Sequence, residues 1–265
     1  MADRYAVIGN PVAHSKSPWI HAEFARACGE DIEYRSIEAP LEGFAGAVDA
    51  FRAAGGRGLN VTLPFKEAAY QYCDRLSARA RAAGVVNTLT FGLEVHGDNT
   101  DGIGLVRDLS DNRGLSFAGK QVLLMGAGGA AQGVAGALLE TGIAGLVIAN
   151  RTASKAEALA ARFPGSRGGG YEALAGKAFD VIINATSAGL SGDAPELPPP
   201  LLRREVLAYD MVYGRDTPFL AAARAAGARA CDGLGMLVEQ AAESFFVWRG
   251  LRPETRPVLA KLRAA

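Results

Sequence analysis

Apolar runs and amphipathic stretches alternate along the first third of the chain. The pattern predicts strands at residues 5–8, 32–37 and 59–62, helices at 18–27 and 41–54, and shorter helices at 64–76 and 78–83. Residues 86–91 and 94–96 are expected to pair as a hairpin around Gly92, and a further helix begins at Asp101 and ends near Leu109. Such regular alternation is typical of an α/β domain.

A second alternating series begins at Lys120. It predicts strands at residues 122–125, 146–149, 180–184 and 207–211, and terminal helices near 234–249 and 253–264 that could pack on either series. The proline-rich segment 195–200 is expected to be a surface loop. With 265 residues, of which 49% are hydrophobic, the chain can form one large or two modest cores.

Charge and cysteine content narrow the class of protein. The 28 basic and 28 acidic residues cancel, so nothing draws the chain toward nucleic acid or an anionic membrane. The cysteines, Cys28, Cys73 and Cys231, are widely scattered and form no metal-ligand pattern with the histidines. We therefore expect a reduced, cytoplasmic protein without structural metal.

A glycine-dense turn follows the first strand of the second series. It reads Gly126-Ala127-Gly128-Gly129-Ala130-Ala131, which meets the G-x-G-x-x-G/A spacing of a dinucleotide-binding turn. Its context is the stronger signal, because an apolar strand precedes it and a helix over residues 130–141 and another strand follow. The glycines also break the run into pieces too short to span a membrane. The sequence thus predicts a nucleotide-binding βαβ unit, with an unliganded βαβ unit as the alternative.

The end of the next strand indicates which dinucleotide is bound. NAD sites place an acidic residue about 20 residues on, where it holds the ribose 2′-hydroxyl. This chain has Asn150-Arg151-Thr152 there, with Lys155 next and no carboxylate before Glu157. If a helix starts near Thr152, Arg151 and Lys155 share one face and suit a 2′-phosphate, which favours NADP. The alternative is that both are ordinary solvated charges.

The first series carries polar motifs of its own. In the loop GNPVAHSKSP at residues 9–18, Ser15 and Ser17 can direct their hydroxyls the same way and hold a carboxylate. Ser17 precedes a proline, so it is equally well interpreted as a helix N-cap. The two interpretations stay open at this point.

The motif NVTLPFK at residues 60–66 combines strand and helix signals. Asn60 and Thr62 alternate along a strand end and face one side, and Pro64 is expected at the first helical position. Lys66 then lies in the first turn, where the positive end of the helix dipole disfavours a cation and eases its loss of a proton. This suits a general acid and base, although a chance surface lysine is the alternative.

The segment GDNTDGIG at residues 97–104 supplies a carboxylate. It departs from a calcium loop at the first and last ligand positions, so we do not expect calcium. Asp101 is either the N-cap of the following helix or a carboxylate that pairs with Lys66 and a substrate hydroxyl.

These motifs stand in an order that resembles the shikimate dehydrogenase family along nearly the whole chain. The run is GNPVAHSKSP, NVTLPFK, VVNTL, GDNTDGIG, GAGGAA, NRT, NATSAG, YDMVYG and GLGMLVEQAA. The single departure is alanine in place of the last fingerprint glycine. The resemblance implies reversible NADPH-dependent reduction of 3-dehydroshikimate to shikimate, a step of aromatic amino-acid biosynthesis, by a monomer or homodimer.

The resemblance also implies roles for individual residues. Lys66 and Asp101 match the catalytic pair, with Lys66 exchanging a proton with the substrate oxygen. Substrate-binding roles fall to Ser15, Ser17, Asn60, Thr62, Asn87, Tyr213 and Gln240. Cofactor-binding roles fall to Gly126, Ala127, Gly128, Gly129, Ala130, Asn150, Arg151, Thr152, Lys155, Thr186, Met211 and Gly235.

The implied architecture has two α/β domains with the active site in the cleft between them. Residues 1–101 and 236–265 would form the substrate domain, and residues 102–235 the Rossmann NADP-binding domain. Two rivals remain: a quinate/shikimate dehydrogenase with relaxed choice of substrate or cofactor, and a non-catalytic member that binds ligands or partners.

Overall fold

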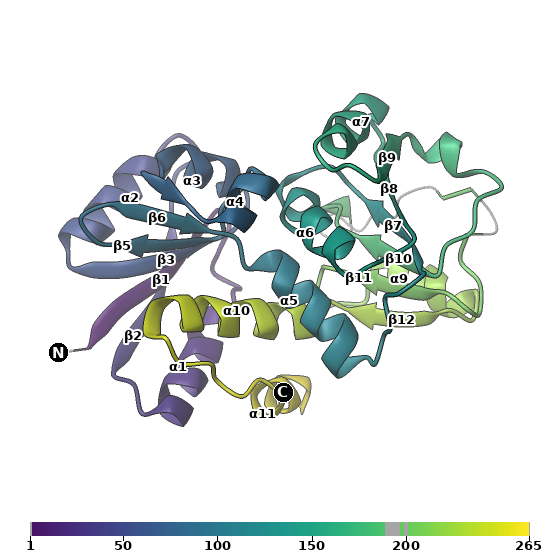
Figure 1. The fold of residues 1–265 in the computed structure, drawn as a ribbon. Helices are drawn as coiled ribbons and strands as arrows, with labels where there is room; N and C mark the ends of the chain where they lie inside the picture. The colour runs from purple at the N-terminus through teal and green to yellow at the C-terminus, as the bar shows by residue number, and fades with distance from the viewer. Residues whose placement is uncertain (1, 189–196, 199–200, 265) are drawn as a thin grey trace. The chain divides into compact units, whose positions relative to one another are not determined.

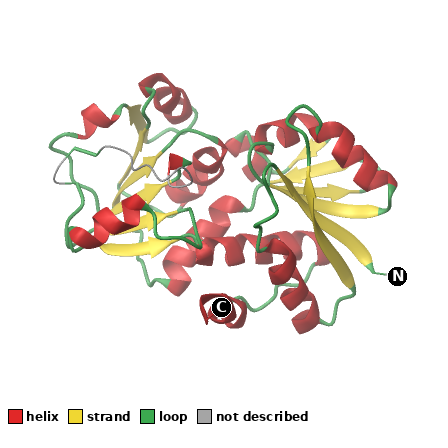
Figure 2. Ribbon diagram, turned by 180° about the vertical axis from the view of Figure 1, so that it is seen from behind, coloured by secondary structure: helices red, strands yellow, loops and turns green. Residues whose placement is uncertain are grey.

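The computed structural model describes residues 2–188, 197–198 and 201–264, and the chain divides into two compact units (Figures 1 and 2). The first comprises Met1–Gly104 and Leu237–Ala265, and the second comprises Leu105–Met236. Figure 2 shows helices on both faces of each sheet, so the α/β fold class expected from the sequence is confirmed. Within the described ranges, no helix combines the length and apolarity that a membrane span requires.

The first unit is built on a six-stranded mixed sheet of order β2-β1-β3-β5-β6-β4. Strand β1 pairs in parallel with β2 and β3, whereas β5 is antiparallel to both β3 and β6. The strands are β1 (Asp3–Gly9), β2 (Ile32–Glu38), β3 (Gly56–Val61), β4 (Arg75–Leu76), β5 (Thr88–Phe91) and β6 (Val95–Asp98).

Helices cover both faces of this sheet. Figure 1 shows α2 and α3 on one face and α1 and α10 on the other. The first face encloses a buried apolar cluster that includes Phe44, Val48 and Phe65. The helices are α1 (Ser17–Cys28), α2 (Phe44–Ala53), α3 (Lys66–Tyr72), α4 (Ala78–Ala83), α5 (Asp101–Arg107), α10 (Leu234–Arg249) and α11 (Arg256–Ala264), of which α5 and α10 extend into the second unit.

The second unit contains a parallel six-stranded sheet of order β12-β11-β10-β7-β8-β9. Numbered within this unit, the order is 3-2-1-4-5-6 from the opposite edge, which is the Rossmann arrangement. The strands are β7 (Gln121–Met125), β8 (Gly145–Ala149), β9 (Ser166–Gly169), β10 (Val181–Asn184), β11 (Leu207–Asp210) and β12 (Arg229–Asp232).

Apolar clusters lie on both faces of the second sheet, because its strands are buried on both sides. One cluster includes Leu124, Val134 and Ile148, and the other includes Leu123 and Phe219. The helices are α6 (Gly129–Glu140), α7 (Ala153–Ala161), α9 (Pro218–Ala225), a 3-10 turn at Tyr171–Leu174 and a π-helical turn at Asp108–Asn112 that continues α5.

Several sequence-based boundaries are wrong. Pro64 is not the first helical residue, because α3 begins two residues later, and the peptide bond before Pro64 is cis. The predicted helix 64–76 ends at Tyr72, since residues 75–76 pair with β6. Strands β9 and β12 were not predicted, because SRGG and RACD lack an apolar run. The proline-rich loop falls mostly outside the described residues.

Candidate active site

The loop after β1 positions two serines at the carboxyl edge of the first sheet. Helix α1 begins at Ser17, its N-cap residue is Lys16, and no side chain caps it. The N-cap interpretation of Ser17 is therefore wrong. The Ser15 hydroxyl instead accepts the backbone N–H of Ser17 at 3.2 Å, and Ser17 is buried, with 6% of its surface exposed.

Asn60 lies at the end of β3 with its amide fully engaged. Its Nδ2 is 2.9 Å from the Ser244 hydroxyl and 3.2 Å from both the Asn87 carbonyl and the Thr88 hydroxyl. Its Oδ1 accepts the Tyr34 hydroxyl at 2.8 Å. Protein groups thus occupy both ends of the Asn60 side chain.

Thr62 follows the end of β3 and is half-buried. The backbone N–H of Thr62 donates to the Ile8 carbonyl at 2.9 Å, so Thr62 lies beside the end of β1.

Lys66 and Asp101 form an ion pair of 2.5 Å between Nζ and Oδ2. Their side chains are 13% and 6% exposed, so the interpretation of Lys66 as a chance surface lysine is wrong. Asp101 is the first residue of α5, and Asn99 rather than Asp101 receives the helix-start N–H, at 3.1 Å. The N-cap interpretation of Asp101 is therefore also wrong.

Asn87 completes this polar group. Its Oδ1 accepts the backbone N–H of Thr100 at 2.8 Å, which fixes the amide orientation, and its Nδ2 donates to Asp101 Oδ1 at 2.9 Å. One oxygen of the Asp101 carboxylate therefore contacts the Lys66 ammonium, and the other accepts a hydrogen bond from the Asn87 amide. Such a pair can hold and exchange a proton with a hydroxyl brought beside it.

Gln240 on α10 reaches the same group. Its Oε1 lies 3.3 Å from Asn87 Nδ2, and its Nε2 donates to the Leu237 carbonyl at 2.8 Å. Gly104 allows this approach, because a Cβ there would lie 2.6 Å from the Gln240 Cβ.

The glycine turn of the second unit lies between β7 and α6. Gly126 has φ of 107°, and a Cβ there would stand 3.0 Å from the Ala185 carbonyl oxygen. Gly128 is the N-cap of α6, with no side-chain cap and no acidic residue in the first turn. The amide groups at this helix start are thus left for an anion, which fits the pyrophosphate of a dinucleotide.

The segment after β8 carries the two cations. Thr152 is the N-cap of α7, so Arg151 precedes the helix and does not share a helical face with Lys155 as expected. Asn150 Nδ2 donates to the Thr152 carbonyl at 3.0 Å, and this bond closes the turn. Both cations are exposed beyond the strand end, a placement that still allows them to meet a 2′-phosphate.

A buried network organises the ends of β10 and β11. Asn184 Oδ1 accepts both the N–H and the hydroxyl of Thr186, at 3.1 and 2.7 Å. Asn184 Nδ2 donates to Asp210, which also accepts the Thr217 hydroxyl at 2.6 Å. Burial raises the pKa of Asp210, and these donors oppose the rise.

Three further predicted residues lie in the second unit. The Met211 N–H donates to the Asn184 carbonyl at 2.9 Å. Gly235 permits close packing, since a Cβ there would collide with the Asp108 carboxylate. Tyr213 is half-buried, and burial raises the pKa of its phenol.

The residues that sequence reasoning missed are those that support others. They are Tyr34, His21, Thr88, Thr100 and Ser244 in the first unit and Asp210 and Thr217 in the second. Asp210 stands inside the motif YDMVYG, so attention to polar residues within apolar strands could have found it.

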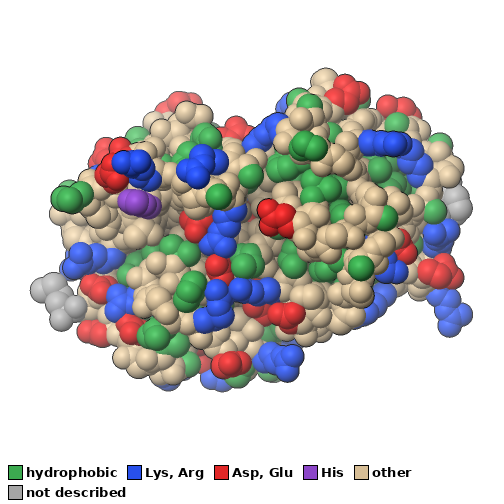
Figure 3. Space-filling view, in the orientation of Figure 1, with side chains coloured by type: hydrophobic (Ala, Val, Ile, Leu, Met, Phe, Trp, Pro, Cys, Tyr) green, Lys and Arg blue, Asp and Glu red, His purple; other side chains and the backbone are tan. Residues whose placement is uncertain are grey.

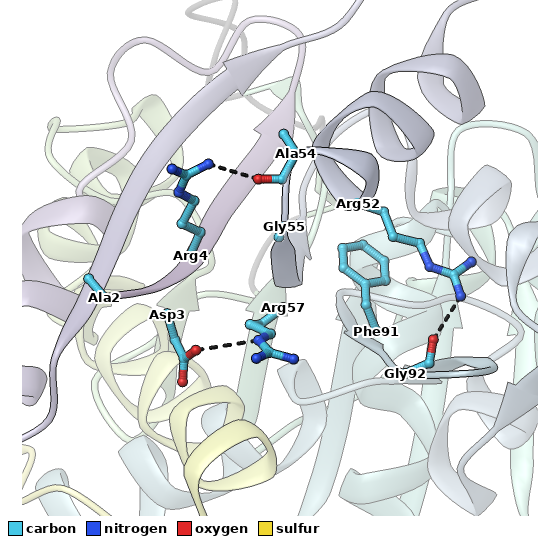
Figure 4. Close-up of a pocket in the computed structure, with 10 residues that line it drawn as sticks. Ala2, Asp3, Arg4, Arg52, Ala54, Gly55, Arg57, Phe91 and Gly92 are labelled. Carbon is cyan, nitrogen blue, oxygen red and sulfur yellow. Dashed lines mark hydrogen bonds and ion pairs between the residues drawn. The ribbon is translucent and has the colours of Figure 1, made fainter.

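The hollow drawn in Figure 4 lies at the opposite, amino-terminal edge of the first sheet. Its arginines are engaged: Arg4 with the Ala54 carbonyl, Arg52 with the Gly92 carbonyl and Arg57 with Asp3. Acidic and basic side chains are interspersed on the face shown in Figure 3. The candidate site is therefore the carboxyl edge, where strand ends bring the polar residues together.

The second unit has a Rossmann sheet and a helix start without a side-chain cap. The first unit holds a largely buried lysine–aspartate pair. Together these features define a dinucleotide-dependent oxidoreductase. Family models agree. Residues 7–89 match the shikimate dehydrogenase substrate binding domain, 108–191 match shikimate / quinate 5-dehydrogenase, and 233–263 match the shikimate 5'-dehydrogenase C-terminal domain.

Known proteins are similar over the full length. The shikimate dehydrogenase (NADP(+)) of Methylobacillus flagellatus is 57% identical, covering 99% of this chain and 100% of the relative. The crystal structure of an Ael1 enzyme from Pseudomonas putida has a TM-score of 0.92 at 49% identity, covering 98% of both chains. Shikimate 5-dehydrogenase from Thermus thermophilus, in complex with NADP(H) and shikimate, has a TM-score of 0.89 at 38% identity, covering 99% of both chains. The chain belongs to the shikimate dehydrogenase family.

Proposed function

We propose that this chain catalyses the reversible NADP-dependent oxidation of shikimate to 3-dehydroshikimate. The observation that carries the proposal is the buried Lys66–Asp101 pair, whose carboxylate is held by Asn87 at the carboxyl edge of the first sheet. Full-length identity to NADP-dependent family members supports the substrate and the cofactor.

The first unit binds the substrate. Ser15 and Ser17 hold its carboxylate, and Thr62, Asn87 and Gln240 surround its ring hydroxyls. Tyr213 of the second unit is a further substrate residue. The Asn60 amide is already occupied by protein groups, so its contribution is to fix its neighbours.

The second unit binds NADP. Residues 126–130 and the start of α6 receive the pyrophosphate, because the turn is narrow and the helix start is uncapped. Arg151 and Lys155 hold the 2′-phosphate, with Asn150 and Thr152 shaping their turn. The nicotinamide end of NADP is bound by Thr186, Met211 and Gly235.

The proton is handled by the first unit. The chemistry supplied by bound NADP is hydride transfer to and from one substrate carbon. In the reduction direction the Lys66 ammonium gives a proton to the substrate oxygen, and in the oxidation direction the neutral Lys66 amine takes the proton of the substrate hydroxyl. Asp101 keeps the Lys66 nitrogen in position and accepts a hydrogen bond from a substrate hydroxyl, while Asn87 holds the carboxylate. The ammonium also stabilises the developing alkoxide.

The test is a matrix of steady-state assays with purified protein. Shikimate and quinate are each offered with NADP and with NAD, and formation of the reduced cofactor is followed. Turnover with shikimate and NADP, and at least tenfold lower kcat/KM with NAD, is the expected result. A second candidate, a dehydrogenase that also accepts quinate, is favoured by the match to the shikimate / quinate family model. A protein that binds NADP but turns over neither substrate would be the non-catalytic member.

We place the protein in the cytoplasm, where biosynthetic substrates and reduced cysteines are expected, as a monomer or homodimer. Sedimentation of the purified chain distinguishes the two states.

A further inference from the structure

The Ser244 hydroxyl lies where α10 contacts three other segments of the first unit. Ser244 is fully buried. Its Oγ is 2.9 Å from Asn60 Nδ2 on β3, 2.9 Å from the Thr88 hydroxyl on β5 and 3.1 Å from the Thr100 hydroxyl just before α5. It also lies 3.0 Å from the backbone carbonyl of Gln240, one turn earlier in α10.

The direction of each hydrogen bond follows from the donors and acceptors present. The Thr88 hydroxyl donates to Asn87 Oδ1 at 2.8 Å, so it cannot also donate to Ser244. The Ser244 proton is therefore available to the Thr88 oxygen or to the carbonyl one turn earlier in α10, both of which accept. With either acceptor, the two lone pairs of the Ser244 oxygen receive the Asn60 amide and the Thr100 hydroxyl.

Asn87 offers the Thr100 hydroxyl no further acceptor. Its Oδ1 already accepts the backbone N–H of Thr100 and the Thr88 hydroxyl, each at 2.8 Å, whereas the Thr100 hydroxyl is 3.2 Å away. The two hydrogens of Asn87 Nδ2 serve its two shortest contacts, the Thr100 oxygen at 2.8 Å and Asp101 Oδ1 at 2.9 Å. Thr100 thus accepts from Asn87 and donates to Ser244.

Gln240 Oε1 is the acceptor that this arrangement leaves to the substrate. It lies 3.3 Å from Asn87 Nδ2 and 3.5 Å from the Thr100 hydroxyl, and both of these donors have shorter partners. The orientation of the Gln240 amide is fixed, because its Nε2 donates to the Leu237 carbonyl at 2.8 Å. A substrate hydroxyl can therefore donate to Gln240 Oε1.

We propose that Ser244 is a positioning residue that draws the Thr100 proton away from Gln240 and so keeps Gln240 Oε1 an acceptor for a ring hydroxyl of the substrate. In Ser244→Ala the Thr100 hydroxyl loses its acceptor. Because a buried hydroxyl is costly to leave unpaired, it turns to Gln240 Oε1, 3.5 Å away, and competes there with the substrate. The inference deepens the proposed function and rests on it.

The test uses shikimate and its two monodeoxy analogues that keep the reacting hydroxyl. The quantity measured for each analogue is its selectivity ratio, which is kcat/KM for shikimate divided by kcat/KM for that analogue. Gln240→Met removes the amide, so the analogue whose ratio falls in this variant is the one that lacks the hydroxyl bound by Gln240.

Ser244→Ala should lower the selectivity ratio of that analogue about tenfold, the value of about one hydrogen bond. The ratio of the other analogue and KM for NADP should stay near those of the wild type. Ser166→Ala is the matched control, since the Ser166 hydroxyl also donates to helix carbonyls, those of Ala160 and Phe163 in the second unit. It should leave both ratios unchanged.

A second pair of variants does not depend on the folding of Ser244→Ala. Thr100→Val removes the oxygen that accepts from Asn87 at 2.8 Å, so the freed amide hydrogen turns to Gln240 Oε1 at 3.3 Å. The same selectivity ratio should fall. Thr100→Ser keeps the hydroxyl and should keep the wild-type ratio.

The outcomes are distinct. Equal losses of kcat/KM with shikimate and both analogues in Ser244→Ala and Thr100→Val would show a general structural role and overturn the proposal. Wild-type ratios in these two variants, or in Gln240→Met, would also overturn it. Failure of the wild-type protein to turn over shikimate would instead refute the proposed function.

Discussion

The Lys66 ammonium and the Asp101 carboxylate meet at 2.5 Å although 35 residues separate them in the chain. Lys66 begins α3 and Asp101 begins α5, so two helix starts bring them together. A cation at a helix start faces an unfavourable dipole, and the carboxylate offsets that cost. The attraction between the two charges, and not the helix dipoles, therefore holds the pair together.

Asp101→Asn is the sharpest test of the carboxylate, because it keeps the shape and removes the charge. The proton-handling lysine loses its counter-charge, so we expect kcat to fall by about 10²-fold or more. KM for NADP should hardly change. Asp180→Asn, which removes the exposed partner of Lys120 in the second unit, is the control and should retain activity. An Asp101→Asn enzyme with wild-type kcat would remove Asp101 from the mechanism.

Arg151→Ala and Lys155→Ala test the preference for NADP. Each removes a charge-assisted contact with the 2′-phosphate, and KM for NADP should rise about 10- to 100-fold. KM for NAD should be unaffected or improve. Arg162→Ala removes a cation at the end of the same helix, beside Phe163, and should change neither value. Equal losses with both cofactors would contradict the assignment.

Gly126→Ala tests the narrow turn. At φ of 107° an alanine is strained, and its Cβ would press on the Ala185 carbonyl. We expect a loss of about 1–3 kcal/mol in the free energy of unfolding, measured in urea, together with weaker NADP binding. Gly46→Ala on α2 meets no atom within 4 Å and should be neutral or slightly stabilising. Unchanged NADP affinity in Gly126→Ala would show that the turn is not the pyrophosphate site.

His21 makes stability depend on pH. Its pKa is lowered by burial from 6.5 to about 3 in the folded chain. Between these values the unfolded chain binds a proton that the folded chain does not, so the free energy of unfolding falls as pH drops. The slope is up to about 1.4 kcal/mol per pH unit.

The comparison is urea unfolding of wild type and His21→Phe at about pH 7 and about pH 5, above most carboxylate titrations. The wild type should lose about 2 kcal/mol more than the variant over this interval. Equal losses in the two proteins would mean that His21 accepts a proton in the folded state.

The sequence was informative where a residue type suited to the chemistry stands within a recognisable hydrophobic or helical pattern. The Rossmann unit could be predicted because apolar strands flank the glycine turn, and the second unit has the expected parallel strands around β7. Lys66 was singled out because a lysine at a helix start is unfavourable. Strand β12 could not be found, because an exposed Arg229 and a terminal Asp232 leave it without an apolar pattern.

Supporting residues were invisible for a different reason. The bond from Tyr34 to Asn60 crosses strand β1 and depends on the strand order, which a linear pattern does not contain. Likewise, Ser17 was equally consistent with a cap until the structure placed Lys16 at the N-cap position. The local sequence identifies candidate residues, and the order of the strands determines which of them come into contact.

Lys66→Ala, assayed with shikimate and NADP, tests the central claim most directly. Loss of the proton acceptor should lower kcat by about 10²- to 10⁴-fold, while NADP binding stays near that of the wild type. Lys120→Ala, which removes an exposed ion pair, should keep full activity. A Lys66→Ala enzyme with kcat within a few-fold of wild type would contradict the account.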